Sequence, residues 1–244
     1  MTNAFDIPNY IQGHIFKNQA SYYDAAKKEF IDQAGYGDAN NLKITTGTPN
    51  FQVVSNNEGL LLDNTYHGKH VSTMPWQGSM VVVLKPNYTS GGTLVRYLTY
   101  IGNNANAGVR AGLQTVSVGG NRRVVLQTGS GVVKNTYEQT GDGLVVIVYA
   151  LDQKTRKCYM TVNGVNVFET YASSSNPTSG NEVALSSGVE GAIFGNINGV
   201  IGDTTAITDF NVYMFEQHFY AGNIITENLA DTKKLIESLK AKYA

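Results

Sequence analysis

The stretch that decides the fold is GLVVIVYALD at residues 143–152, followed by CYMTVNGVNVF at residues 158–168. The first segment is a continuous apolar run with the length of a strand in a protein core. In the second segment apolar and polar side chains alternate with a period of two, which is typical of a strand. Asn163-Gly164 follows, and this dipeptide suits a type I′ turn because both central residues need a positive φ. The stretch therefore predicts antiparallel strands closed by a hairpin at Asn163-Gly164.

Similar short runs continue in both directions along the chain, with turn-forming residues between them. The composition agrees, because 26 glycines serve tight turns and 15 tyrosines favour pleated, half-buried surfaces. The alternation of strand and helix that indicates a parallel sheet is missing. We therefore expect an all-β fold, a two-sheet antiparallel jelly-roll sandwich. Further strands are expected at residues 51–55, 59–63, 79–85, 94–101, 109–113, 123–127, 191–194 and 208–215.

Two segments near the ends of the chain carry a helical period instead. Residues 22–34 begin near Ser21 and Asp24, which form a weak capping box, and Gly35 supplies a C-terminal cap. Residues 228–242 place apolar side chains on one stripe, with an acid in the first turn and lysines in the last. We expect a short N-terminal helix and a C-terminal helix that docks on the sandwich.

The charge balance and the single cysteine argue against several classes of protein. With 18 Lys and Arg against 19 Asp and Glu, the chain lacks the basic surface that phosphate backbones require, so we expect no nucleic-acid partner. Cys158 is alone, which rules out an intrachain disulfide and a Cys-rich metal site. No signal sequence and no apolar run of spanning length is visible, so we expect no membrane insertion.

The order of the expected strands resembles a known family. It is similar to the concanavalin A-like lectin/glucanase sandwich, especially its laminin G-like branch, over about residues 51–240. Domains of this type occur in phage fibres, decoration proteins and adhesins, so the resemblance implies that kind of setting. The segments that carry it are Lys85-Pro86 at the end of a strand, then residues 143–152, 158–165, 191–195 and 207–213, followed by the terminal helix.

The catalytic pattern of hydrolases on this fold is missing from the sequence. Those enzymes carry Glu-x-Asp-x-x-Glu on one strand, because alternation then brings the carboxylates to one face. Neither this spacing nor a Gly-x-Ser-x-Gly elbow occurs, and Cys158 lies in an alternating strand typical of a buried thiol. We therefore expect no catalytic residues and no enzyme. The acidic residues considered are mostly isolated: Glu169, Glu182, Glu190, Asp203, Asp209 and Glu216.

Metal binding has two candidate arrangements. His67 and His70 could converge on an ion, but a glycine between them breaks a helix and no cysteine is near. The resemblance to lectin domains implies calcium as an alternative, held by Asp203 or by Asn103 and Asn104. Asparagine is also a common turn former. We expect no metal and no cofactor, with calcium as the open alternative.

A glycan site is the best candidate for a ligand-binding site. Glycan sites on such folds pair an aromatic platform with polar groups that bond hydroxyls. For any single aromatic residue the alternative is simple packing. The candidate residues are Trp76, Tyr66, Tyr88, Tyr97, Tyr100, Asn103, Asn104 and Arg110.

Residues 1–40 precede the resemblance and are too apolar for a flexible tail. We expect them to form an arm and helix, while residues 41–244 form the sandwich with its C-terminal helix. The arm either covers the sandwich's own surface or anchors the protein to an assembly. The candidate anchoring residues are Phe5, Ile7, Tyr10, Ile11, Ile15 and Phe16.

These observations lead to one main functional hypothesis and two alternatives. The main one is a non-enzymatic structural or adhesive component of a phage-like virion. Its partners are other virion proteins or copies of itself, with cell-surface polysaccharide as a further partner, and its location is the virion or an extracellular surface. The first alternative is a glycan-binding module that acts as a receptor binder. The second is a carbohydrate-active hydrolase or lyase.

Overall fold

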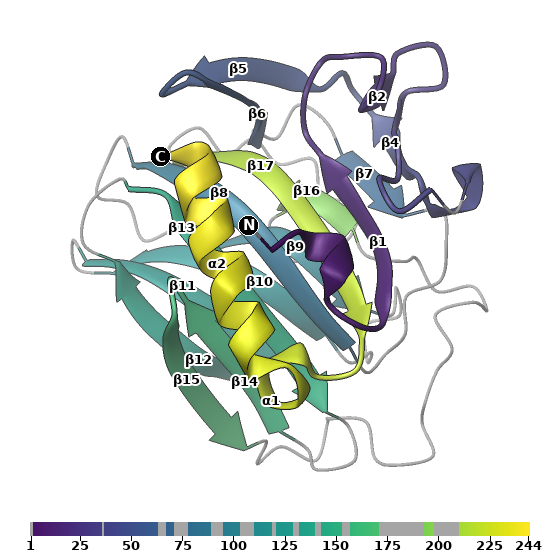
Figure 1. The fold of residues 1–244 in the computed structure, drawn as a ribbon. Helices are drawn as coiled ribbons and strands as arrows, with labels where there is room; N and C mark the ends of the chain where they lie inside the picture. The colour runs from purple at the N-terminus through teal and green to yellow at the C-terminus, as the bar shows by residue number, and fades with distance from the viewer. Residues whose placement is uncertain are drawn as a thin grey trace.

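The computed structural model describes residues 2–35, 37–62, 67–70, 78–88, 95–102, 110–118, 121–128, 132–139, 143–152, 157–170, 193–197 and 210–244. Within these ranges the chain forms two sheets whose strand pairings are antiparallel. Figure 1 shows helix α2 (Leu229–Tyr243) lying across one face of the first sheet, with the N-terminal segment beside it. The two-sheet antiparallel sandwich expected from the sequence is confirmed.

The first sheet has eight strands in the described part of the chain. Its longest strand, β17 (Phe210–Ala221), pairs with β8 along one edge. Along the other edge it pairs first with β6 and then with β1. The remaining order, from the far edge, is β15 (Val165–Thr170), β14 (Lys157–Val162), β13 (Val145–Asp152), β8 (Gly78–Tyr88), β17, β6 (Asn57–Leu62) and β5 (Asn50–Val54), with β1 (Tyr10–Ile15) outside this path.

The second sheet has nine strands in the described ranges. Each strand predicted above overlaps a strand of one of the two sheets, while β1, β2, β3, β4, β7 and β12 were not predicted. Its order is β12 (Val132–Gln139), β11 (Asn121–Thr128), β10 (Arg110–Val118), β9 (Val95–Gly102), β16 (Ile193–Ile197), β7 (His67–His70), β4 (Leu42–Thr46), β3 (Glu29–Phe30) and β2 (Tyr23–Asp24).

The central strands of the first sheet are buried on both faces, which explains their unbroken apolar sequences. In β8, Val81 and Val83 pack into a core with Leu235 of α2. The alternate residues Val82 and Leu84 are also fully buried, on the face away from the helix. Each such side chain contributes roughly 1.5–3 kcal/mol on burial. The helix therefore adds a third layer to the sandwich.

The hairpin predicted at Asn163-Gly164 is confirmed. Asn163 has a φ of 51° and Gly164 a φ of 90°, as a type I′ turn requires. Strands β14 and β15 pair in register on either side, with Val162 opposite Val165. The turn is also fixed from outside, because the Asn163 side chain accepts a hydrogen bond of 2.8 Å from the Val146 amide.

The helix predicted at residues 22–34 is wrong, because this stretch forms β2, a turn and β3. Asp24 does accept hydrogen bonds from the Ala26 and Lys27 amides, but these close a turn. Lys28 then adopts a φ of 56°, which ends any helical path. Pairing of Tyr23 with Phe30 brings two buried rings within 4.9 Å of each other, so strand packing overrides the local helical signal.

The C-terminal helix predicted at residues 228–242 is confirmed as α2. A single turn, α1 (Ile224–Glu227), precedes it and is capped by the Asn223 side chain, which accepts from the Ile225 and Thr226 amides. The Thr232 hydroxyl donates to the Ile224 carbonyl at 2.9 Å and ties the two helices together. No helix of the described ranges has both the length and the apolar character needed to cross a membrane.

The N-terminal segment is part of the first sheet and of its helix-side core. A 3-10 turn, η1 (Ala4–Asp6), leads into β1. The side chains of Ile7 and Phe16 are 1% and 0% exposed, and the Tyr220 hydroxyl donates to the Ala4 carbonyl at 2.9 Å. Residues 2–16 therefore cover the sandwich of their own chain. A further role of this segment in anchoring to an assembly stays a prediction, and Phe5, at 48% exposed, is accessible for it.

Candidate functional site

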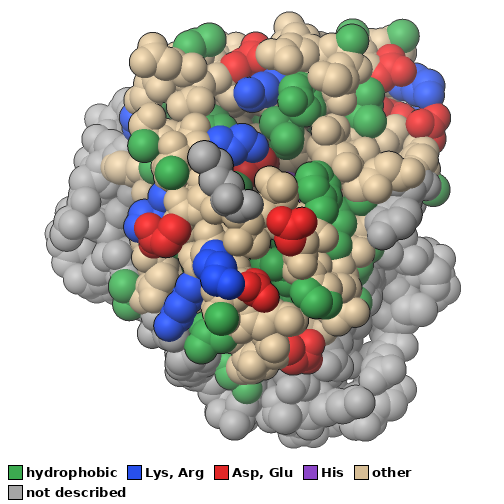
Figure 2. All heavy atoms as spheres, viewed as in Figure 1, with side chains coloured by type: hydrophobic (Ala, Val, Ile, Leu, Met, Phe, Trp, Pro, Cys, Tyr) green, Lys and Arg blue, Asp and Glu red, His purple; other side chains and the backbone are tan. Residues whose placement is uncertain are grey.

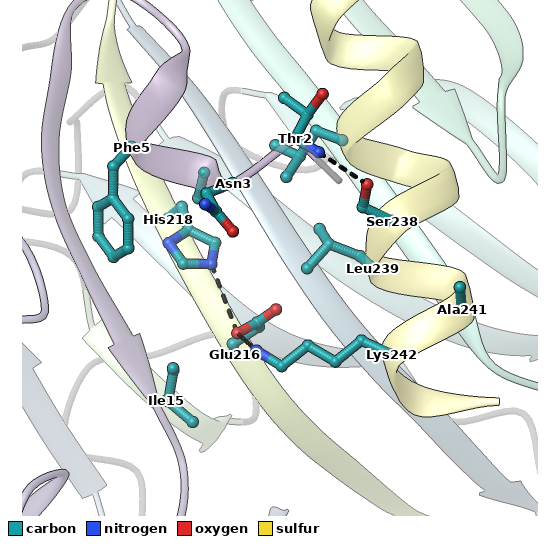
Figure 3. Close-up of a pocket in the computed structure, with 12 residues that line it drawn as sticks. Thr2, Asn3, Phe5, Ile15, Glu216, His218, Ser238, Leu239, Ala241 and Lys242 are labelled. Atoms are coloured by element: carbon teal, nitrogen blue, oxygen red, sulfur yellow. Dashed lines mark hydrogen bonds and ion pairs between the residues drawn. The ribbon is translucent and has the colours of Figure 1, made fainter.

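A pocket of about 330 Å³ lies where the N-terminal segment, β17 and the last turns of α2 meet. Figure 3 shows Phe5 and Asn3 on one side, Leu239 and Lys242 on the other, Thr2 joined to Ser238 of α2, and Glu216 and His218 between the two sides. The surface on this side of the molecule carries charged side chains of both signs, interspersed with apolar ones (Figure 2). The surface charge around the pocket is therefore not dominated by one sign.

A bulge in β17 gives the pocket its charged base. The register between β17 and β8 shifts between Met214 and Glu216, so Phe215 is the extra residue. Phe215 stacks on Tyr243 of α2 with ring centroids 4.8 Å apart. Glu216 also contacts α2, and alternation then places His218 and Tyr220 on the same helix-facing side.

Glu216 is a buried carboxylate whose two oxygens differ in their partners. Its side chain is 2% exposed, and Oε2 accepts a hydrogen bond of 2.9 Å from Lys242 Nζ. His218 Nε2 lies 3.7 Å from the same oxygen. Within the described residues Oε1 has no hydrogen-bond partner, and neither have His218 Nε2 and the buried hydroxyl of Tyr243. All three of these polar atoms are buried, so the part of the pair that borders the pocket is the partly exposed Lys242.

Glu216 stays ionised in this setting. Burial opposes the charge, but the neighbouring His218 imidazole and the hydrogen-bonded ammonium of Lys242 outweigh it and hold the pKa of Glu216 at about 2. Burial raises the pKa of Tyr243, and the charge of Glu216 raises it further, so this phenol stays protonated. The base of the pocket thus holds a mostly buried ion pair, with the protonated phenol of Tyr243 close by.

A cluster of aromatic rings lies next to the pocket, and Phe5 is its member among the described lining residues. Tyr10 of β1 lies between Phe5 and Tyr220, with ring centroids 5.0 Å and 5.3 Å apart, and its hydroxyl is 3.0 Å from His218 Nδ1. When this hydroxyl donates to Nδ1, the imidazole proton sits on Nε2, the nitrogen nearest Glu216. Phe5 lines the pocket and is half-exposed. The surface that the pocket offers is therefore mostly apolar.

The pocket is not built for hydrolysis of a glycosidic bond. That reaction uses a pair of carboxyl groups, one of them with a raised pKa so that it can act as an acid. Glu216 is the one carboxylate among the described lining residues, and its pKa is lowered. Sequence reasoning treated Glu216 as an isolated acid. The polar cluster Glu216-Gln217-His218, set between the apolar runs Val212–Phe215 and Phe219-Tyr220, is the signal that could have identified it.

The glycan-binding candidates of the sequence do not gather at this pocket. Tyr97 and Tyr100 lie in β9, and Arg110 begins the neighbouring strand β10, where it pairs with Gly102. These three share the second sheet, whereas Tyr88 ends β8 in the first. Trp76, Tyr66, Asn103 and Asn104 lie outside the described residues.

The metal-binding and catalytic candidates other than Glu216 are also absent from the described residues that line the pocket. His67 and His70 mark the two ends of β7, and the described residues contain no group of three or more His, Cys, Asp and Glu arranged to hold an ion. Cys158 and Glu169 occupy paired positions in β14 and β15. The remaining candidates, Glu182, Glu190, Asp203 and Asp209, lie outside the described residues.

Comparison with solved structures supports the β-sandwich fold. No protein-family model and no curated protein sequence matches the chain. Domain 4 of AbnA, an extracellular arabinanase from Geobacillus stearothermophilus, in complex with arabinotriose, matches with a TM-score of 0.56 and 14% identity, covering 95% of this chain and 98% of that one. This neighbour has a similar fold over its whole length.

Two toxin domains also match. The receptor-binding domain of botulinum neurotoxin type G has a TM-score of 0.57 and 14% identity, covering 96% of this chain and 51% of that one. A structure of botulinum neurotoxin type C, a toxin that depends on two ganglioside molecules to get into cells, has a TM-score of 0.59 and 9% identity, with 95% of this chain and 51% of that one covered. The chain spans about half the length of these toxin domains. At such identities the likeness extends to the β-sandwich fold, and the concanavalin A-like and laminin G-like assignment stays a prediction.

Proposed function

We propose that this chain is a non-enzymatic carbohydrate-binding module. The observation that carries the proposal is the likeness to AbnA domain 4, a domain in complex with arabinotriose whose fold matches over nearly the full length of both chains. The described part of the chain adds a mostly apolar pocket lined by the half-exposed ring of Phe5 and by Lys242, and an aromatic ring beside a hydrogen-bond donor is an arrangement that suits sugars. Because fold alone does not define function, the proposal rests on this combination.

Two regions are candidates for the glycan site. One is the part of the second sheet that holds Tyr97, Tyr100 and Arg110, where aromatic residues and a donor lie in adjacent strands. The other is the pocket around Glu216.

We further propose that the module works at a virion or extracellular surface, as a structural or adhesive component of a phage-like particle. The resemblance of its strand order to domains of phage fibres and adhesins supports this setting. The partners are then other virion proteins or copies of the chain, together with surface polysaccharide. A receptor binder outside any virion is the second candidate, and the likeness to toxin receptor-binding domains favours it.

A glycan array tests the proposal. The purified chain is applied to a panel that includes arabino-oligosaccharides, sialylated glycans and bacterial capsular polysaccharides, and each ligand that binds is then incubated with the chain and analysed for products. We expect retention of at least one glycan class and no turnover. Absence of binding across the panel contradicts the carbohydrate-binding function, and reproducible product formation contradicts the non-enzymatic assignment.

A further inference from the structure

We propose that strand β5 (Asn50–Val54) is an assembly edge, where the first sheet pairs with the first sheet of a second copy of this chain in an antiparallel contact centred on Gln52. The inference does not depend on the carbohydrate-binding function. Its experiment contains no glycan, so each proposal can fail while the other stands.

The edge formed by β5 is open in the described part of the chain. There β5 ends the path of the first sheet and pairs with β6 alone, and Figure 1 shows it at the outer limit of the sheet, at the top of the view. Proteins protect such edges with charged side chains, proline or a bulge. The sequence of β5 is NFQVV, without a charge or a proline, and its pairing with β6 has no shift in register. Val53 is also 72% exposed.

The turn between β5 and β6 determines which backbone groups face outward. Ser55 and Asn56 have φ values of 51° and 65° and form a two-residue turn, with Val54 opposite Asn57. A turn of this kind is closed by a hydrogen-bonded pair. Hydrogen-bonded and non-hydrogen-bonded pairs then alternate along an antiparallel ladder, so every second residue of β5 directs its amide and carbonyl away from β6.

This alternation selects one register for self-pairing. The amide and carbonyl of Gln52 face β6, whereas those of Phe51 and Val53 face outward. With a two-fold axis at Gln52, Phe51 of each copy lies opposite Val53 of the other, and each outward amide meets an outward carbonyl. A register centred two residues toward either end loses this match, because Pro49 has no amide proton and Ser55 belongs to the turn.

A second copy fits this edge because a two-fold contact asks only that the strand match itself. No charge on β5 opposes its own copy, and the formal net charge of the chain is only -1. The strand is already held in place, since the Phe51 ring lies 5.4 Å from that of Tyr23 and 5.9 Å from that of Phe30. Pairing also brings the exposed Val53 beside Phe51 of the second copy. A strand of five residues is a small contact, so we expect a weak, concentration-dependent dimer.

Sedimentation velocity of the full chain over a wide range of concentrations, at low salt, tests the contact. The variants are Gln52→Lys and Gln52→Glu, each alone and mixed in equal amounts, because the proposed register places residue 52 opposite itself. The matched control is Val165→Lys, which adds the same charge at an exposed position on β15, at the other end of the sheet. Amide exchange, measured at low and high concentration, reports on the backbone of β5 directly.

We expect the wild type to dimerise as its concentration rises, and each Gln52 variant alone to dimerise about threefold more weakly or worse, because like charges then face each other. The equal mixture should regain dimers, and Val165→Lys should behave as the wild type. The amides of Phe51 and Val53 should become protected at high concentration, while that of Gln52 is protected throughout.

Three results contradict the proposal. A wild type that stays monomeric at every concentration shows that a second copy does not occupy this edge. Gln52 variants that dimerise as well as the wild type place the dimer contact elsewhere. A mixture that dimerises no better than the separate variants rules out the two-fold register at Gln52.

Discussion

Glu216 in the middle of β17 and Lys242 in the last turn of α2 form an ion pair of 2.9 Å, in which the carboxylate is 2% exposed and the ammonium side chain 43%. The pair connects the outer helix to the central strand of the sheet at the base of the pocket (Figure 3). It holds a buried carboxylate through a partly exposed ammonium. The predictions below concern this pair, other parts of the fold and the function proposed for the chain.

Removing Lys242 should destabilise the fold more than removing a neighbouring lysine. Lys242→Ala leaves the buried carboxylate of Glu216 without its closest cation, and because the lysine is partly exposed we expect a loss of about 1–2 kcal/mol in unfolding free energy. Lys240→Ala removes an exposed pair with Glu237 and should cost about 0.5 kcal/mol or less. Urea denaturation at neutral pH measures both. Equal losses in the two variants are inconsistent with a buried role for the Glu216 pair.

Stability should fall as the pH is lowered below about 6.5, because of His14. This imidazole is buried in β1, and burial lowers its pKa from the ordinary 6.5 to about 3, with the charge of His218 lowering it further against a hydrogen bond to the Asn40 carbonyl. The unfolded chain then binds a proton that the folded chain does not, so each pH unit between 6.5 and about 3 removes about 1.4 kcal/mol.

Glu216 adds a second contribution at lower pH. Its folded pKa of about 2 lies below the ordinary 4.5, so its stabilisation is complete above pH 4.5 and is lost as the pH falls toward 2. Denaturation curves from pH 7.5 down to 4.5 therefore report the contribution of His14 to the stability without that of Glu216. The variant His14→Gln should flatten the slope in this window, and an unchanged slope rules out His14 as its source.

Substitution of Gly164 tests the hairpin. The glycine has a φ of 90° and open space where a β-carbon would stand, so the cost of Gly164→Val comes from the backbone conformation. We expect a loss on the order of 1 kcal/mol or more in unfolding free energy. Gly143→Ala is the control, because that glycine also has open space but no positive φ. A melting temperature unchanged by Gly164→Val counts against the type I′ turn.

The N-terminal segment should prove part of the core. Ile7→Ala and Phe16→Ala each remove a fully buried side chain and should cost about 2–5 kcal/mol. Phe5→Ala, at the half-exposed neighbour in the same segment, should cost far less. Thermal and chemical denaturation compare the three. If the first two variants are as stable as the third, the segment is only loosely attached to the sandwich.

Local sequence patterns predicted the elements whose conformation depends on neighbouring residues. They failed where contacts between residues distant in the sequence determine the conformation. Asn163-Gly164 needs only its own backbone preferences to form a turn, so the hairpin was predictable. The carboxylate of Asp24 caps a turn as readily as a helix, and only the packing of Tyr23 on Phe30 decides between them. Tyr10 and His218 are 208 positions apart in the chain, so no sequence pattern shows that β1 and β17 bring them together.

The measurement that tests the central claim most directly is a calorimetric titration of the chain with the tightest ligand of the glycan array, followed by product analysis of the same sample. If the chain is a carbohydrate-binding module, the titration gives a saturable heat of binding and the glycan is recovered intact. No heat of binding for any ligand of the array, or recovery of cleaved glycan, contradicts the account.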